Sequence, residues 1–403
     1  MDKKIELLSP AGDMEKLIMS VTYGADAVYL AGNMFGMRAA AGNFDEDGIR
    51  EAVKLCHDKN VKVHVTCNTI PRNNEVAFLP GYLEFLQDAG VDALIIADIG
   101  VMALAKKYAP KAELHVSTQM GVANYETARA LHDMGAKRVV LARERSLDDI
   151  ATLRAKTPTD LEIETFVHGA MCVSFSGRCL LSNYLIDRDA NRGQCAQPCR
   201  WKFHLVEERR PGEYFRISED NGTYILNSRD MRMIEHIPEL ISAGIDSLKI
   251  EGRAKSSYYA AAVTNAYRHA IDAALRGESL DDIWIQETEH VSHREYSTGF
   301  YYDHSGPGQF YGSAMYFTDC DVAAYVEDCG DDLVGTLTQR NKFSVGDTLS
   351  LITPDGGKPV TFTAQGMKNA DGEDVETLPH PMMEFTMPLP VKAPKYSILR
   401  KMK

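Results

Sequence analysis

The sequence lacks the long apolar segments of a membrane protein. None of its hydrophobic runs approaches the roughly 18 residues that a membrane-spanning helix needs. Its first residues, MDKKIELLSPAGD, are charged and continue into a strand-like segment, which is not the pattern of a signal peptide. We therefore expect a soluble, cytoplasmic protein with no membrane partner. Cysteines in that compartment stay reduced, and they serve metal binding or catalysis more often than disulfides.

Several catalytic signatures are also missing. The chain has no H-E-x-x-H motif of zinc proteases and no G-x-S-x-G nucleophile elbow. A Cys172–His168 nucleophile–base pair is conceivable, although only closeness in the sequence suggests it. The net charge of −13 argues weakly against a nucleic-acid partner. Basic residues do gather between Arg178 and Arg216 and in the last twelve residues, where charge alone indicates no more than a solvated surface.

Eight short apolar segments with strand character alternate with helical periodicities in the first part of the chain. They lie at residues 5–12, 25–32, 61–69, 91–98, 113–121, 136–144, 161–169 and 246–253. Eight alternations of strand and helix predict a (β/α)8, TIM-like barrel. A doubly wound open sheet is the alternative, but no glycine-rich fingerprint follows the first strand.

The predicted barrel occupies residues 1–280. Its seventh and eighth strands are separated by an unusually long interval, with a cysteine-containing insertion at 170–225. An acidic linker is expected at 281–314. The remainder, 315–403, is rich in glycine, aromatics and alternating residues, which predicts a small antiparallel β domain.

Alternation within the strands predicts which side chains face the barrel lumen. The apolar set packs outward on the helices, so the alternate set points inward. The inward set comprises Glu6, His64, Thr66, Asn68, His115, Ser117, Gln119, Glu162, Glu164, Phe166, His168, Lys249, Glu251 and Arg253. Because burying unpaired charge is costly, this polar set favours an active site at the carboxyl ends of the strands.

We assign roles to these residues and to others expected around the same mouth. The predicted catalytic residues are Glu164, His168, Lys249 and Glu251. The predicted substrate-binding residues are Glu6, Arg38, Asn68, Asp98, Gln119, Arg143 and Arg253. Arginine forks suit carboxylate or phosphate groups. Taken singly, each of these residues is equally compatible with a structural ion pair.

Four of the eight cysteines follow the seventh strand directly. Cys172, Cys179, Cys195 and Cys199 have the spacing C-x6-C-x15-C-x3-C. Four thiols are the ligand set of an iron–sulfur cluster or of a structural zinc ion. Zinc sites usually contain two close pairs, and only CAQPC is close here, so the spacing favours a cluster. The alternative is that the four are small buried residues.

The segment ETFVHGAMCVSFSGRCLLS, residues 164–182, resembles the signature of peptidase family U32. The segments ELLSPAG, GADAVYLAG, LNSRDM and SLKIEGRAKSSYY are also similar to this family. The resemblance covers residues 5 to 275, and the β-rich tail is similar to the family's C-terminal extension.

The resemblance implies a function as well as a fold. The family is named for collagenase-like activity, but its better-understood members are oxygen-independent hydroxylases of tRNA, ribosomal RNA or a quinone precursor, several with a [4Fe–4S] cluster. The tandem GQCAQPCRW makes the sequence most similar to the tRNA branch, which uses prephenate to hydroxylate C5 of the wobble uridine. The implied cluster ligands are Cys172, Cys179, Cys195 and Cys199.

Three hypotheses follow. The first is a tRNA hydroxylase with a [4Fe–4S] cluster, for which tRNA and the dicarboxylate prephenate are the partners. The second is a peptidase that depends on Glu164 or His168. The third is a zinc-stabilised RNA-binding module without catalysis. Assembly into a homo-oligomer, or with a family relative, is left open.

Overall fold

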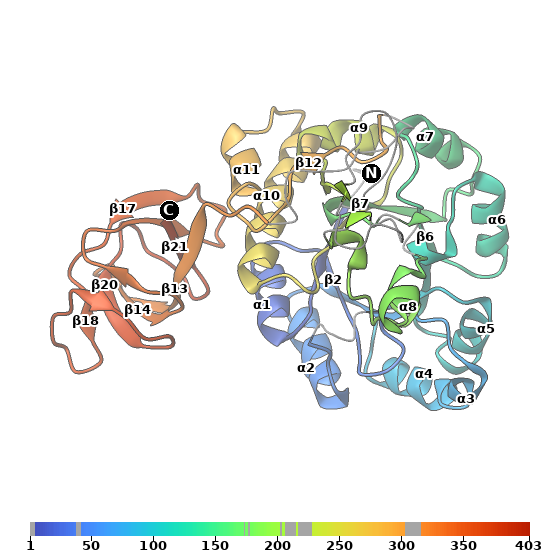
Figure 1. The fold of residues 1–403 in the computed structure, drawn as a ribbon, viewed down its shortest axis with the longest axis horizontal. Coiled ribbons are helices and arrows are strands. Elements are labelled where there is room, and N and C mark those ends of the chain that lie inside the picture. Colours follow the sequence, from blue (N-terminus) through green and yellow to red (C-terminus); the bar gives the residue numbers. More distant parts are fainter. Residues whose placement is uncertain are drawn as a thin grey trace.

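A computed structural model describes residues 5–37, 42–172, 174–175, 178–201, 204–205, 215–216, 228–302 and 316–403. Across these ranges no helix combines the length and the apolar character needed to cross a membrane. The chain forms a barrel ringed by helices and a smaller β domain that projects to one side of it (Figure 1).

Eight parallel strands close into a barrel in sequence order. They are β1 (Glu6–Pro10), β2 (Ala27–Leu30), β3 (Lys62–Cys67), β4 (Ala93–Ile96), β5 (Glu113–Val116), β6 (Arg138–Val140), β7 (Glu162–Ala170) and β11 (Ser247–Ile250). Strand β11 closes the barrel because it pairs in parallel with β1 on one side and with β7 on the other. The predicted (β/α)8 barrel is therefore confirmed, and the doubly wound alternative is wrong.

Helices surround the strands (Figure 1). They are α1 (Met14–Thr22), α2 (Glu46–His57), α3 (Asn73–Val76), α4 (Leu79–Asp88), α5 (Ile99–Tyr108), α6 (Tyr125–Asp133), α7 (Leu147–Ala155), α9 (Ile237–Ser242) and α10 (Ser257–Arg276), with a 3-10 turn η1 (Thr118–Met120). Short polar side chains begin many of them, such as Asp13, Asn124 and Ser256, whose oxygens accept a backbone N–H of the first turn. Outward strand residues such as Val65 and Ile163 are fully buried beneath the helices, and this apolar layer stabilises the barrel.

The chain between β7 and β11 adds further elements. They are α8 (Leu181–Ile186), η3 (Ala190–Arg192), η4 (Pro198–Arg200), β8 (His204–Leu205), β9 (Phe215–Arg216), β10 (Asp230–Arg232) and η5 (Ile234–His236). Strand β10 runs antiparallel along the end of β7, and β12 (Tyr296–Ser297) pairs with β10. The segment expected as a linker thus contains α11 (Asp282–Glu287) and returns to the barrel sheet through β12.

The C-terminal domain has its own antiparallel sheet and core. Its strands are β13 (Cys320–Cys329), β14 (Val334–Gln339), β15 (Phe343–Ser344), β16 (Thr348–Ile352), β17 (Val360–Thr363), β18 (Lys368–Asn369), β19 (Thr377–Leu378), β20 (Glu384–Pro388) and β21 (Ile398–Met402). Seven of them form one sheet in the order β17-β16-β21-β13-β14-β20-β18, and β15 pairs with β19. The predicted class of this domain is confirmed.

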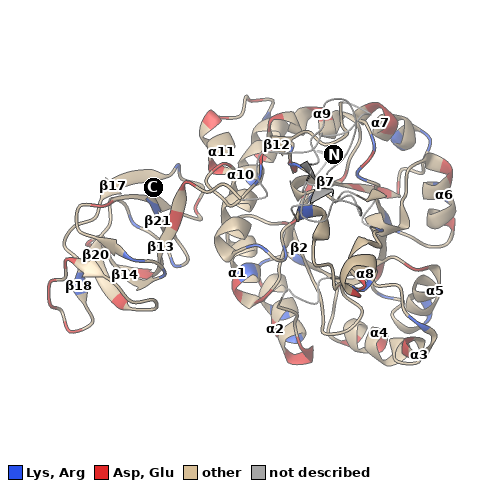
Figure 2. Cartoon of the chain, in the orientation of Figure 1, with Lys and Arg blue, Asp and Glu red and all other residues tan. Residues whose placement is uncertain are grey.

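A buried ion pair joins the two domains. Arg400 of β21 donates to Glu287 of α11 and to the Tyr258 hydroxyl of α10 at 2.8 and 2.9 Å. The side chains of Arg400 and Glu287 are each only 3% exposed, so this contact is sealed from water. The other basic residues near the C-terminus are paired on the surface: Lys392 with Asp331, Lys395 with Glu327, Lys401 with Asp347 and Lys403 with Asp321. Acidic residues are spread over the outer helices and the β domain (Figure 2).

Candidate active site

Charged side chains from several strands meet in the barrel lumen. Arg138, at the start of β6, donates to Glu162 at 2.6 Å and to Glu164 at 2.9 Å, and it also binds Glu6. Lys249 of β11 donates to the other oxygen of Glu164 at 2.8 Å. Carboxylates on strands β1 and β7 therefore share two cations, and the predicted inward orientation of Glu6, Glu164 and Lys249 agrees with these contacts.

The lowered pKa values of Glu164 and Glu6 favour the ionised form of both carboxyl groups. Burial alone would raise the pKa of Glu164, but the charges of Lys249 and Arg138 outweigh it and hold the pKa at about 2. The pKa of Glu6 is also strongly lowered, because the charge of Arg138 overcomes the effect of burial. A carboxylate with so low a pKa is a weak proton acceptor. We conclude that Glu164 is suited to positioning Lys249 rather than to removing a proton.

Two buried histidines lie beside these charges, and His115 is the register partner of Arg138 on the neighbouring strand. The rings of His64 and His115 meet edge to face with centroids 4.7 Å apart. Burial lowers the pKa of both, so neutral imidazoles are favoured. Within the described ranges, both ring nitrogens of His64, the Thr66 hydroxyl and the Gln119 amide have no hydrogen-bond partner. These side chains come from the neighbourhood of β3 and β5 and offer polar atoms that the protein itself leaves unused.

Aromatic rings flank two cations of the site. The Lys249 ammonium lies 4.6 Å from the ring centre of Tyr29 and 5.5 Å from that of Phe166. The Arg143 guanidinium stacks on the Phe166 ring, 3.8 Å from the ring centre, and one of its nitrogens lies 3.9 Å from a carboxylate oxygen of Glu251. Aromatic faces hold cations by electrostatic attraction. The mouth therefore presents oriented cations that suit an anionic ligand.

The four cysteines follow this mouth. The backbone N–H of Leu181 donates to the sulfur of Cys179 at 3.3 Å, and that of Gln197 donates to the sulfur of Cys195 at 3.4 Å. Burial raises the pKa of Cys172, and the thiols of Cys179 and Cys195 add to the rise. The pKa of Cys199 is also raised by burial, with contributions from all three other thiols. The four sulfurs therefore lie within electrostatic range of one another.

This donor set fits a thiolate-bound metal group. Iron–sulfur clusters and structural zinc are both held by four cysteine sulfurs, and N–H groups directed at the sulfurs stabilise their negative charge. Taken over the described parts of the chain, no three His, Cys, Asp or Glu side chains already stand in the arrangement of a formed metal site. The fit rests on the chemistry and proximity of the sulfurs.

Comparison with known proteins identifies the family. The model of peptidase family U32 matches residues 12–309, and that of the peptidase family U32 C-terminal domain matches residues 318–400. The chain belongs to peptidase family U32. The resemblance inferred from the signature is thus confirmed for both domains.

Relatives of this U32 chain carry two kinds of name. It is 36% identical over 406 residues to tRNA hydroxylation protein P1 of Bacillus subtilis, covering 99% of this chain and 95% of that protein. It is 35% identical over 430 residues to tRNA hydroxylation protein P of Escherichia coli, covering 96% and 94%. An uncharacterized protease of Methanocaldococcus jannaschii is 40% identical over 358 residues, covering 86% of each chain.

The inward orientation predicted for His168 is wrong. A β-bulge places Phe166 opposite Lys249 but His168 opposite Ile250, so one extra residue of β7 reverses the alternation. The ring nitrogens of His168 lie 3.3 and 3.4 Å from the hydroxyls of Tyr267 and Tyr296, outside the lumen. With both nitrogens engaged there, the conceivable Cys172–His168 pair does not form.

Other predicted ligand residues have local structural contacts. Asp98 caps α5, since its carboxylate accepts the N–H of Val101 at 3.0 Å. The amide oxygen of Asn68 accepts the N–H of Met37 at 3.1 Å and so fixes the loop after β2. Arg253 is buried beside the first strand, where its carbonyl oxygen packs against Gly12. Arg38 lies outside the described residues.

Arg138 is the site residue that sequence analysis missed. Its neighbours Val139 and Leu141 are fully buried on the outer face, so Arg138 falls on the inner face of β6. The alternation rule applied to "RVVLAR" would have placed it inward. It is also the central cation of the lumen, binding carboxylates on two strands.

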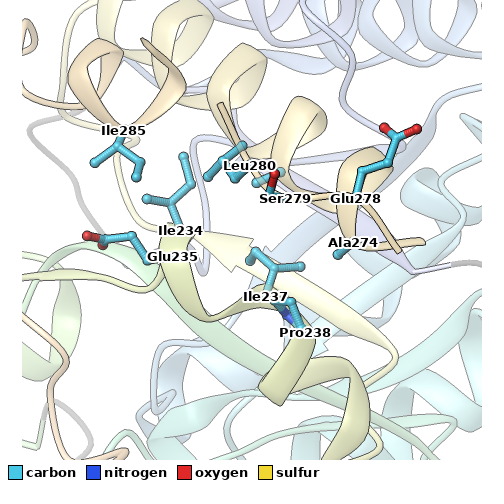
Figure 3. Close-up of a pocket in the computed structure, with 10 residues that line it drawn as sticks. Ile234, Glu235, Ile237, Pro238, Ala274, Glu278, Ser279, Leu280 and Ile285 are labelled. Atoms are coloured by element: carbon cyan, nitrogen blue, oxygen red, sulfur yellow. The ribbon is translucent and has the colours of Figure 1, made fainter. Parts of the chain in front are cut away.

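An apolar pocket of about 330 Å³ lies on the outer side of the barrel (Figure 3). It is lined by Ile234, Glu235, Ile237, Pro238, Ala270, Ala274, Glu278, Ser279, Leu280 and Ile285. These residues come from η5, α9, the second half of α10, the connection that follows it and α11, and none of them belongs to the lumen or to the cysteines. The pocket is therefore separate from the candidate active site.

Proposed function

We propose that this U32 chain is an oxygen-independent RNA hydroxylase that places a hydroxyl group on C5 of the wobble uridine of tRNA. The observation that supports it most is the likeness over nearly the full length, both domains included, to tRNA hydroxylation proteins P1 and P. The charged and aromatic mouth of the barrel gives this likeness a chemical basis, because it offers cations and polar atoms to an anionic substrate.

Prephenate is the proposed co-substrate. It is a dicarboxylate, and the mouth holds the Arg143 guanidinium and the Lys249 ammonium in fixed positions against Phe166 and Tyr29. A guanidinium can bind a carboxylate through two parallel hydrogen bonds. In this proposal Arg143 and Lys249 bind the carboxylates, Glu164 orients Lys249, and Gln119 contacts the ligand through its unused amide.

The proposed cofactor is a [4Fe–4S] cluster held by Cys172, Cys179, Cys195 and Cys199, with zinc as the alternative. When bound, such a cluster would supply redox or Lewis-acid chemistry beside the mouth. Metal and sulfide analysis of anaerobically purified protein separates the two: about four irons with sulfide, or one zinc without colour. A Cys199→Ser variant that keeps its full iron content would show that the fourth ligand lies elsewhere.

The function is tested by deleting the gene and measuring tRNA nucleosides by mass spectrometry. We expect 5-hydroxyuridine at the wobble position to disappear and to return with the wild-type gene but not with a Lys249→Met gene. Unchanged 5-hydroxyuridine in a strain without a paralogue would refute the proposal. The peptidase alternative predicts cleavage of a collagen-like peptide by the purified protein, with loss of cleavage on Glu164→Gln.

A further inference from the structure

Three cations from distant parts of the chain surround one tyrosine next to the cysteines. Arg200 and Arg294 both donate to the Tyr316 hydroxyl, at 2.8 and 2.9 Å. The Lys255 ammonium lies 3.9 Å from the centre of the Tyr316 ring, and the Arg294 guanidinium lies 4.6 Å from it. Arg200 directly follows Cys199 in the chain, so this cluster lies at the edge of the cysteine segment.

Positive charge exceeds negative charge in this cluster. Asp230 approaches Arg294 at 3.4 Å, and no other ion pair to the three cations is found among the described residues. Arg294 is 1% exposed, and its Nε has no partner among described residues. Burial, reinforced by the charges of Arg294 and Arg200, lowers the pKa of Lys255 to about 8, while Asp230 and Glu251 oppose this effect. Like charges are thus held together at a cost, as in a binding site for an anion.

Among the described residues, the Tyr316 hydroxyl has no acceptor for its own proton. A phenol oxygen accepts through its lone pairs and donates through its single proton. Both contacts described for this hydroxyl are donations from guanidinium groups, so the oxygen is the acceptor in each. Its proton therefore points away from them. Tyr316 is 38% exposed, so part of this residue is accessible from solvent.

We propose that Arg200, Lys255 and Tyr316 form an oxyanion site beside the cysteine segment. Arg294 is the positioning residue, because it is buried and holds the Tyr316 hydroxyl. The ligand group is an oxygen anion that accepts from the phenol and from both cations. Two ligands of the proposed function carry such a group, a backbone phosphate of RNA and a carboxylate of a small acid. The proposal rests on the proposed function only for the choice of these two probes.

The test uses equilibrium binding of the full chain to a tRNA transcript at several salt concentrations. Binding strength falls with salt in proportion to the number of phosphates neutralised. We expect Lys255→Gln and Arg200→Gln each to weaken binding about three- to tenfold and to lower the slope of log K against log salt by about 0.7 to 0.9. Arg200→Lys keeps the charge and should preserve most of the slope.

The matched control is Lys395→Gln. This lysine is 54% exposed on the C-terminal domain and pairs with Glu327 at 3.3 Å, so its removal changes net charge equally without touching the cluster. We expect its affinity and salt slope to equal those of the wild type. Tyr316→Phe is a second variant, which removes only the hydroxyl and should weaken binding with little change in slope. Thermal unfolding of each variant confirms that it is folded.

The second arm measures calorimetric binding of malonate, a simple dicarboxylate, to the same variants. Variants with weakened tRNA binding and wild-type malonate binding identify a phosphate site. Variants with weakened malonate binding and wild-type tRNA binding identify a site for a small acid, and both results support the proposal. Wild-type binding of tRNA and malonate by all folded variants would overturn it. Neither arm measures hydroxylation, so failure here is distinct from failure of the proposed function.

Discussion

The barrel lumen and the cysteine segment differ in how their reactive groups are satisfied. In the lumen, Arg138 and Lys249 are bound by carboxylates that the barrel itself supplies. In the cysteine segment, no disulfide forms among the described thiols, and α8 exposes apolar side chains such as Tyr184, at 80%. The charged groups of the lumen are therefore satisfied by folding alone, whereas the four thiols of the cysteine segment stay unbridged in the described structure.

The largest effect is expected on removal of the central cation of the lumen. Arg138→Met leaves Glu6 and Glu164 buried with one cation fewer, so we expect a loss of about 3–5 kcal/mol in the free energy of unfolding. Urea denaturation measures it. Arg129→Met is the control, since Arg129 forms an exposed pair with Glu126 on α6 and should cost less than about 1 kcal/mol. Equal losses in the two variants would contradict a special role for the lumen.

Acid should weaken the lumen in a defined range. The folded pKa of Glu164 is lowered from 4.5 to about 2, so its contribution is present above pH 4.5 and is lost as the pH falls towards 2. The contribution is on the order of 3 kcal/mol. Glu164→Gln should therefore show a shallower fall in unfolding free energy over that range than the wild type. Parallel curves for both proteins would contradict this expectation.

In the cysteine segment, a substitution should change metal binding rather than stability. Cys179→Ser should lose most of the bound iron after anaerobic reconstitution, yet cost the metal-free protein less than about 1 kcal/mol, because Cys179 is only partly buried. Cys56→Ser, in the buried face of α2, should keep its iron and lose stability instead. Iron analysis and thermal unfolding of the metal-free protein measure the two quantities. Iron retention by Cys179→Ser would remove this residue from the ligand set.

The smallest effect is expected at Thr66, where the lumen itself has an unused group. Its hydroxyl has no partner in the described part of the chain, so Thr66→Val should leave stability unchanged within about 0.5 kcal/mol while lowering tRNA hydroxylation. Thr264→Val is the matched control, because that buried hydroxyl bonds to Ser9 at 2.9 Å. It should cost about 1–2 kcal/mol. Full hydroxylation by Thr66→Val would show that the substrate does not use this group.

Much of the barrel could be predicted because the alternation of residues within each strand indicates which side chains face the helices and which face the lumen. All eight predicted strands occur, and alternation placed Glu164 and Lys249 correctly in the lumen. The prediction was wrong at His168, because a bulge arises from pairing with β11 and leaves no local signal in β7. The capping contact of Asp98 was predictable in principle, since an aspartate before a helical pattern is a common N-cap.

Long-range contacts set the other limit of prediction. The last basic residues look like a cationic tail in the sequence, but Arg400 is buried against Glu287, 113 residues away. The grouping of the cysteines is visible in the sequence, and their role as metal ligands stays a prediction. The N–H groups directed at the sulfurs of Cys179 and Cys195 depend on turns that only the folded segment contains. The proposed phosphate or carboxylate contacts at Tyr316 likewise combine residues from three separate segments.

The ion pair between Glu164 and Lys249 joins residues 85 positions apart. The segment between them leaves the barrel after β7 and returns at β11, which is the neighbouring strand. The entropy lost on closing such a loop rises only slowly with its length, by about 0.6 kcal/mol for each doubling. Once this ion pair forms, the segment between β7 and β11 can be longer or shorter at little cost in the free energy of folding. The cysteine segment can therefore change its length and contents during evolution, while the strands that hold its two ends keep the same register.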